Sequence, residues 1–359
     1  MQHIARMWVP GFVTEPWSRI QPRPFPETTS VPVIKQPQSP SAPPAPKLDD
    51  ADRKMIELLL KDGRMSGREI AQGTGLSEAN VSRRLARLIE DGAVRIIGLV
   101  EPYLLGLKTR SIVLLKCNGD CFAIAERLAK LPSVYWCGVT FGEYDLVLFV
   151  VAKDDHDLLA CCDSILESER GISVFVNCHM LETIHSNGEK TISIDQNSTK
   201  GLTRHAAKLD EVDHALIRML QVDGRTSFAD LAAAADISAT SAADRYRQLS
   251  QSGIVQLITL PNPISMGTPV RFTACITVNG PIRQAMRAIA NLPNCVWSCG
   301  VGGVYAIITE FHCEDETCMN HIRAKLANIP GVTSVGISLH RRVVLDSFCW
   351  GHLEQSHSL

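Results

Sequence analysis

Apolar residues recur at helical spacing through the first part of the chain, and the breaks between them separate three helices. The 3.6-residue period runs over residues 48–61 and stops at an Asp-Gly-Arg turn. It resumes over residues 66–72, and again from Ser77, whose hydroxyl suits an N-cap, to Glu90. Three helices with a tight turn before the last predict a helix-turn-helix.

The period changes to strand-like alternation after this segment. Ser111 to Cys117, "SIVLLKC", is typical of a strand, and "YDLVLFVVA", from Tyr144, of another. The expected elements are strands at 111–117, 134–140, 144–152 and 172–184, with helices at 121–130 and 154–168. This βαββαβ order predicts a ferredoxin-like domain.

The chain carries this whole unit twice. Adding 161 to a residue number in 47–96 gives its counterpart without a gap, and sixteen of these fifty positions are identical. Chance pairing would give about one in twenty, so the unit is duplicated. The expected fold class is α+β, with two tandem units, each a (winged) helix-turn-helix followed by a ferredoxin-like sensing domain. The expected parts are a disordered proline-rich arm (1–46), helix-turn-helix domains (47–100 and 208–261), ferredoxin-like domains (108–184 and 269–347) and a linker (185–207).

Charge and cysteine usage narrow the class of protein. The formal net charge is −2, so a surface for nucleic acid must be a local patch. The twelve cysteines lie in apolar patterns with no Cys-x-x-Cys, and no apolar run approaches the ~18 residues of a membrane span. We expect a cytoplasmic protein with free thiols, no membrane partner and no cofactor. A metal site built from His312, Cys313, Cys318 and His321 is the less favoured alternative, because Cys318 continues an apolar helical stripe.

The third helix carries the chemistry of a reader of DNA. Its apolar stripe of Val81, Leu85 and Leu88 must face the other two helices, which leaves asparagine and arginine on the opposite face. Arginine suits guanine and phosphate oxygens, and asparagine suits adenine. The residues expected to contact double-stranded DNA are Ser77, Asn80, Arg83, Arg84 and Arg87, with Arg245 as a minor contributor from the second copy.

The second helix-turn-helix keeps its apolar positions and loses basic ones. Arg83 corresponds to Asp244, Arg87 to Gln248 and Asn80 to Ser241. Residues 47–98 hold ten basic and nine acidic side chains, whereas residues 208–259 hold five and seven. Since affinity for DNA follows the number of phosphates neutralised, we expect the first copy to supply most of it.

The combination of "LSEANVSRRLARLIEDGAV", the strand-like "RIIGLV" and "VTFGEYDLVLFV" resembles the Lrp/AsnC (feast/famine) family of transcriptional regulators, here in tandem. The resemblance implies a DNA-binding regulator whose sensing domains pair in a dimer and bind a small molecule, usually an amino acid, between subunits. By match, the effector loop would comprise Thr140, Phe141, Gly142, Glu143, Tyr144 and Asp145. Asp145 either accepts a hydrogen bond from the ligand's ammonium group or is satisfied by local amides.

Two departures from the family pattern matter. Ala306 stands where the first unit has Asp145, so one effector site per chain is expected to be competent if that carboxylate matters. The family's two-fold dimer is expected within a single chain as a pseudo-dimer, with further homo-oligomers above it.

Two other classes of function remain as alternatives. Sirohaem decarboxylases share the double architecture, but the His-Asn-Tyr-x-Arg stretch they carry is matched here by "SVYWCGVTFGEYD", which lacks both His and Arg. We therefore expect no enzyme activity. The third class is a partner subunit that joins assemblies of family members without binding DNA.

Overall fold

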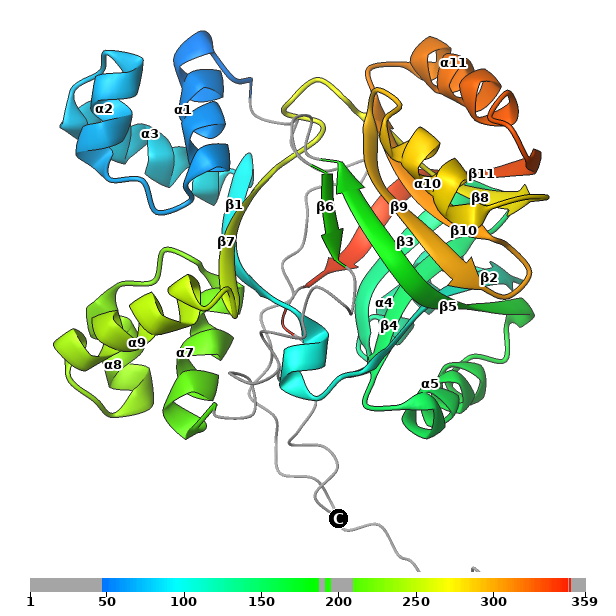
Figure 1. Ribbon diagram of the computed structural model, residues 1–359, viewed down its shortest axis with the longest axis horizontal. Helices are drawn as coiled ribbons and strands as arrows, with labels where there is room; N and C mark the ends of the chain where they lie inside the picture. Colours follow the sequence, from blue (N-terminus) through cyan, green and yellow to red (C-terminus); the bar gives the residue numbers. More distant parts are fainter. Residues whose placement is uncertain (1–46, 187–190, 195–208, 348, 350–359) are drawn as a thin grey trace, which may run out of the picture. The chain divides into compact units, whose positions relative to one another are not determined.

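The computed structural model describes residues 47–186, 191–194, 209–347 and 349 (Figure 1). The first helix-turn-helix consists of α1 (Asp50–Lys61), α2 (Gly67–Thr74) and α3 (Glu78–Glu90), followed by strand β1 (Val94–Val100). Each helix begins at a side chain that accepts a hydrogen bond from a backbone N–H of the first turn, as N-caps do: Asp49, Ser66 and Ser77. The apolar stripes of the three helices enclose one core, as their period predicts.

The second helix-turn-helix repeats these elements 161 residues later. It consists of α7 (Glu211–Val222), α8 (Phe228–Ala235), α9 (Ala239–Gln251) and strand β7 (Val255–Pro261). Strand β1 pairs with β7 in antiparallel register, Val94 opposite Pro261 and Val100 opposite Val255. The strand expected to form a wing is therefore paired with the other copy.

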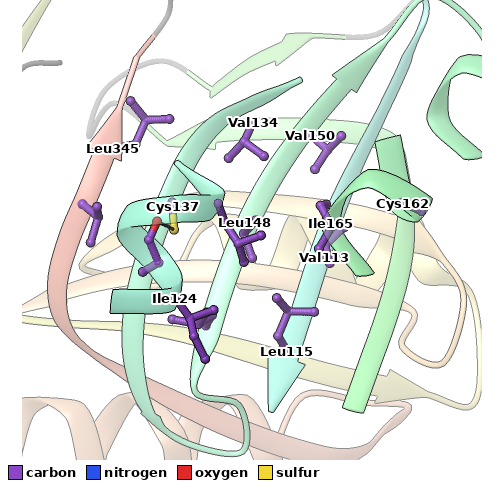
Figure 2. Packing of buried hydrophobic residues seen from close by; sticks show 14 of the residues in the cluster. Val113, Leu115, Ile124, Val134, Cys137, Leu148, Val150, Cys162, Ile165 and Leu345 are labelled. Carbon is purple, nitrogen blue, oxygen red and sulfur yellow. Dashed lines mark hydrogen bonds between the residues drawn. The ribbon is translucent and has the colours of Figure 1, made fainter. Parts of the chain in front are cut away.

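The first sensing unit follows a short 3₁₀ helix, Pro102–Leu105. Its strands β2 (Thr109–Cys117), β3 (Val134–Gly142), β4 (Leu146–Ala152) and β5 (Ile172–Ser186) form a sheet in the order β5-β2-β4-β3. Helices α4 (Cys121–Leu128) and α5 (Asp155–Ser168) pack their apolar sides on one face of this sheet. Figure 2 shows this core, in which Ile124 and Ile165 lie over Val113, Leu115 and Leu148.

The second sensing unit has the same order of elements. Its strands are β8 (Val270–Val278), β9 (Cys295–Gly302), β10 (Ile307–Cys313) and β11 (Val332–Asp346), and its helices are α10 (Ile282–Ala290) and α11 (Glu316–Ala327). The ferredoxin-like topology expected for both units is confirmed.

The two sheets join into one closed ring of strands. Strand β3 pairs with β11, and β5 pairs with β9, so each strand from β2 to β5 and from β8 to β11 has two neighbours within the ring. Their inward side chains form a shared apolar cluster that includes Ile112, Trp136, Trp297 and Ile308. The ring is the intrachain pseudo-dimer that the duplication predicts, and it leaves no open sheet edge between the two units.

One segment differs from the expectation. Residues 191–194, expected within the linker, form strand β6, which pairs with β5. The proline-rich segment 1–46 and linker residues 195–207 lie outside the described residues. None of the helices in the described ranges combines the length and apolar character that a bilayer crossing needs.

Candidate functional site

Helix α3 presents a polar face to solvent because its apolar stripe packs in the core of the domain. Val81 and Leu88 are fully buried, and the Ser77 hydroxyl accepts from the backbone N–H of Asn80 at 3.4 Å. Arg83 is exposed on the opposite side, and its Nη2 donates to the Asn80 side-chain oxygen at 3.1 Å. A guanidinium and a carboxamide therefore stand side by side on the exposed face of the helix.

Arg84 was expected to contact DNA, but its side chain lies against carboxylates at the N-terminus of α1. Its Nη1 donates to Asp49 at 2.7 Å and to Asp52 at 2.8 Å, and only 22% of its side chain is exposed. Arg87 donates to the other Asp52 oxygen at 2.6 Å but remains 49% exposed. Asp52 itself is 1% exposed. Arg84 thus holds α3 against the N-terminus of α1, a structural role that the sequence did not indicate.

Arg245 makes the same connection in the second copy. It donates to Asp210 at 2.8 Å and to both oxygens of Asp213, so the interaction is a feature of the repeated fold. On the exposed side of α9, Arg247 pairs with Asp244 at 2.5 Å on the same helix. The exposed face of α9 therefore carries an internally neutralised pair where α3 carries Arg83 and Asn80.

Two arginines of the Asp-Gly-Arg turns connect the copies. Arg64 donates to the carbonyls of Gly224 and Thr226, both at 2.8 Å, and Arg225 donates in return to the carbonyl of Gly63 at 2.7 Å. The Arg64 guanidinium also lies over the ring of Tyr246, 4.5 Å from its centroid. The only signal in the sequence for this contact was the identity of the turn in both copies.

The predicted effector loop of the first unit packs against the second unit. The N–H of Glu143 donates to the Ile337 carbonyl at 3.0 Å, and that of Tyr144 donates to the Ser338 hydroxyl at 3.1 Å. Gly142 has φ +137°, and a Cβ there would collide with the Ile337 carbonyl, so glycine is required. Thr140 is buried and donates to the Tyr144 carbonyl, whereas Phe141 is 74% exposed.

Asp145 forms hydrogen bonds with backbone groups of its own unit. Its Oδ2 accepts from the backbone N–H of Cys117 at 2.9 Å, and its own N–H donates to the Leu115 carbonyl. Of the two roles that the sequence left open, this geometry favours the structural one.

Glu143 is the carboxylate of the loop that has an unused oxygen. Its Oε1 accepts from the Tyr305 hydroxyl at 2.7 Å, whereas Oε2 is buried without a hydrogen-bond partner among the described residues. The carboxylate occupies the space that a side chain at Gly336 would fill. The equivalent positions in the other half are Val304, which is 67% exposed, and Phe175, so only one of the two related sites has this acceptor.

The metal alternative finds no support in the geometry. Cys313 is buried, His312 donates toward Glu310 at 2.8 Å, and His321 is exposed on α11. Within the described ranges, no group of three or more His, Cys, Asp or Glu side chains is arranged to hold a metal ion.

Family models match three segments of the chain. Residues 48–95 match a winged helix-turn-helix DNA-binding model, residues 209–250 the AsnC-type helix-turn-helix domain, and residues 111–188 the Lrp/AsnC ligand binding domain.

Curated relatives match over about one unit. HTH-type transcriptional regulator FL11 of Pyrococcus furiosus is 35% identical over 113 residues, which is 31% of this chain and 75% of the relative. An uncharacterised HTH-type transcriptional regulator of Pyrococcus abyssi is 31% identical over 135 residues, 35% of this chain and 85% of the relative. Such relatives are therefore about as long as one of the two units.

A solved structure matches both units together. The sirohaem decarboxylase NirDL, in complex with an iron-uroporphyrin III analogue, aligns with a TM-score of 0.59 over 85% of this chain and 98% of its own, at 13% identity. At that identity the likeness shows the fold alone.

Proposed function

The chain belongs to the Lrp/AsnC family of transcriptional regulators, and we propose that it binds specific DNA sequences and responds to a small molecule, expected to be an amino acid. The observation that carries the DNA-binding part is the exposed pair of Arg83 and Asn80 on α3, beyond the Ser77 cap of a helix-turn-helix. We place this activity in the cytoplasm, in keeping with twelve free thiols.

Arg83 and Asn80 are the proposed base-reading side chains, and Arg87, which is half-exposed, is the proposed phosphate contact. Arg84 and Arg245 act as positioning residues in this proposal, because carboxylates of α1 and α7 already occupy them. Ser77 contributes by capping the N-terminus of α3, where the backbone N–H groups of the first turn would face phosphates.

The proposed operator is asymmetric. The β1–β7 pairing and the reciprocal Arg64 and Arg225 contacts hold the two helix-turn-helix domains together as a pair, yet their exposed faces differ in charge. One strong half-site and one permissive half-site per chain are the expected footprint.

Footprinting of the full chain on genomic fragments, combined with retardation assays at rising salt, tests this proposal. Arg83→Ala or Asn80→Ala should weaken binding by roughly 1–3 kcal/mol, whereas Ser241→Ala, at the Asn80 position of α9, is the control with little effect. Two equally protected half-sites would contradict the asymmetry. If Arg245→Ala abolishes binding while Arg84→Ala/Arg87→Ala does not, the roles of the two copies are reversed.

The proposed effector site is the loop around Glu143. Its unpartnered Oε2 is a suitable acceptor for the α-ammonium group of an amino acid, because a buried carboxylate oxygen without a donor is costly. Since Val304 replaces Glu143 in the second unit, the proposal predicts one such site per chain.

Thermal-shift measurements with a panel of amino acids test the effector site. Glu143→Gln should remove the stabilisation by the active amino acid, and Asp145→Asn is the control that keeps it. Equal loss in both variants, or two bound ligands per chain, would contradict the assignment.

Two tests separate this function from its alternatives. The curated relatives are named as transcriptional regulators, and the likeness to NirDL lies in the fold. A spectral change when the pure protein is incubated with sirohaem would favour the enzyme. Failure of the chain to retard any genomic fragment, even at low salt, would favour a partner subunit that does not bind DNA.

A further inference from the structure

The interior of the strand ring contains a polar cluster in its second half. Along β10, Ile307 and Phe311 pack in the core that contains α10 and α11, whereas Ile308 belongs to the interior cluster. Because side chains alternate along a strand, Glu310 and His312 share the interior face with Ile308. Arg271 lies opposite His312 on β8, and Trp297 lies opposite Glu310 on β9.

Glu310 is fully satisfied by its neighbours. It accepts hydrogen bonds from Arg271 at 3.0 Å, from the His312 ring at 2.8 Å and from the Trp297 indole at 3.0 Å. Burial alone would raise the pKa of this carboxyl, but the Arg271 charge and the His312 hydrogen bond outweigh it and hold the pKa well below its usual range. Glu310 and Arg271 therefore form an ionised pair whose side chains are only 6% and 8% exposed.

The first unit keeps Arg110 and His179 at the positions of Arg271 and His340, but three of the surrounding polar residues are absent there. At the equivalent interior positions the first unit has Phe149 for Glu310, Val151 for His312 and Ile112 for Thr273. Phe149 stacks on Trp136 with ring centroids 5.0 Å apart. Burying an ion pair usually stabilises a protein no more than apolar residues of similar volume do, so stability does not explain why the second unit keeps it.

Two nitrogen atoms of the cluster lack hydrogen-bond partners among the described residues. They are Arg271 Nε and His340 Nδ1, and both are buried. The other ring nitrogen of His340 is 2.8 Å from the Thr273 hydroxyl. When Thr273 donates to that nitrogen, the proton of the neutral ring is on Nδ1. A buried donor without an acceptor destabilises the protein, and an oxygen acceptor on a ligand would relieve that cost.

We propose that Arg271 and His340 bind a small carboxylate anion inside the ring, at a site separate from the Glu143 loop. The Arg271 side chain supplies the charge, and Nε of Arg271 and Nδ1 of His340 donate to the two oxygens of the ligand. Both oxygens of Glu310 already accept hydrogen bonds, so this carboxylate leaves those two N–H groups unoccupied. His312, with 21% of its side chain exposed, connects the cluster to solvent.

The experiment uses the full-length chain with acetate as probe and acetamide as its neutral isostere. Acetate should bind in isothermal titration calorimetry, and the ring nitrogen resonances of His340, assigned by their loss in His340→Gln, should shift. Acetamide should bind at least about tenfold more weakly, because a charged acceptor makes the stronger hydrogen bond to guanidinium.

The duplication supplies matched controls. Arg271→Gln should weaken the binding of acetate at least about tenfold, whereas Arg110→Gln, at the equivalent position of the first unit, should leave the affinity unchanged. If Arg271→Gln fails to fold because Glu310 is left unpaired, Arg271→Met/Glu310→Met removes both members of the ion pair. This double variant should also lose the binding of acetate.

Three results would overturn the proposal: no acetate binding by the folded wild type, equal effects of acetate and acetamide on His340, or unchanged binding in the double variant. Glu143→Gln should leave acetate binding intact. The interior site and the proposed effector site can therefore fail independently.

Discussion

The hydroxyl groups of Tyr144 and Tyr305 lie 2.7 Å apart, although 161 residues separate them in the chain. That separation is the repeat offset, so two equivalent residues meet where the two units face each other. The symmetry ends there, because Tyr305 donates to Glu143 and therefore accepts from Tyr144. A duplicated chain can thus build an asymmetric site from symmetric positions.

This asymmetry predicts unequal effects for two similar substitutions. Tyr305→Phe leaves both Glu143 Oε1 and the Tyr144 hydroxyl without a partner, whereas Tyr144→Phe removes one donor to Tyr305. Urea denaturation should show a loss in the free energy of unfolding of about 2 kcal/mol for Tyr305→Phe and about half of that for Tyr144→Phe. The reverse order would mean that the hydrogen bond to Glu143 does not form in solution.

Arg84 should contribute to stability rather than to DNA recognition. Arg84→Ala removes one of the two arginines bound to Asp52, a carboxylate that is 1% exposed, and should lower the free energy of unfolding by about 2 kcal/mol. Denaturation curves test this, with the exposed Arg83→Ala as control, expected within about 0.5 kcal/mol of wild type. If the Arg84→Ala protein is as stable as wild type and has lost its affinity for DNA, Arg84 contacts DNA directly.

The weakened face of the second copy should be restorable. Asp244→Arg replaces an acidic side chain by the residue that the first copy has at Arg83. It also breaks the pair that neutralises Arg247. Binding measured by fluorescence anisotropy should tighten, and the salt dependence should steepen by about one counterion or more. Asp163→Arg on α5 changes the net charge equally at an exposed position of the sensing unit, so an equal gain there would show that only global charge matters.

The local features of this structure could be predicted from the sequence. The cap at Ser77 and the change from helical to alternating period are local signals, and the predicted elements lie close to the observed ones. The β1–β7 pairing and the closure of the ring join residues far apart in the chain, and strand patterns carry no information on such partners.

The same limit applied to the candidate sites. A helical period shows that Arg83 and Arg84 are polar positions of α3, but not that Asp49 and Asp52 lie beside Arg84 and leave Arg83 exposed. Likewise, the loop was predicted from its motif, yet the unpaired carboxylate is Glu143, because a distant strand places Gly336 next to it. The identity of Arg64 and Arg225 in the two copies does not reveal their role, because their contacts lie across the pair of domains.

Acid should destabilise the protein through His340. Burial lowers the pKa of its ring from an ordinary value of 6.5 to about 3, with Arg271 and His312 adding to the effect and Glu310 opposing it. The His340 ring also contacts the Thr273 hydroxyl and the Trp136 ring. Below pH 6.5 the His340 ring binds a proton in the unfolded chain but stays neutral in the folded protein. The contribution of His340 to the free energy of unfolding is therefore complete above pH 6.5 and is lost as the pH drops toward 3.

Between pH 6.5 and 5, His340 should contribute a slope of up to about 1.4 kcal/mol per pH unit. Urea denaturation across this window should show a shallower slope for His340→Leu than for wild type. If His340→Leu and wild type run parallel, the ring takes up its proton in the folded state and is not held neutral by burial.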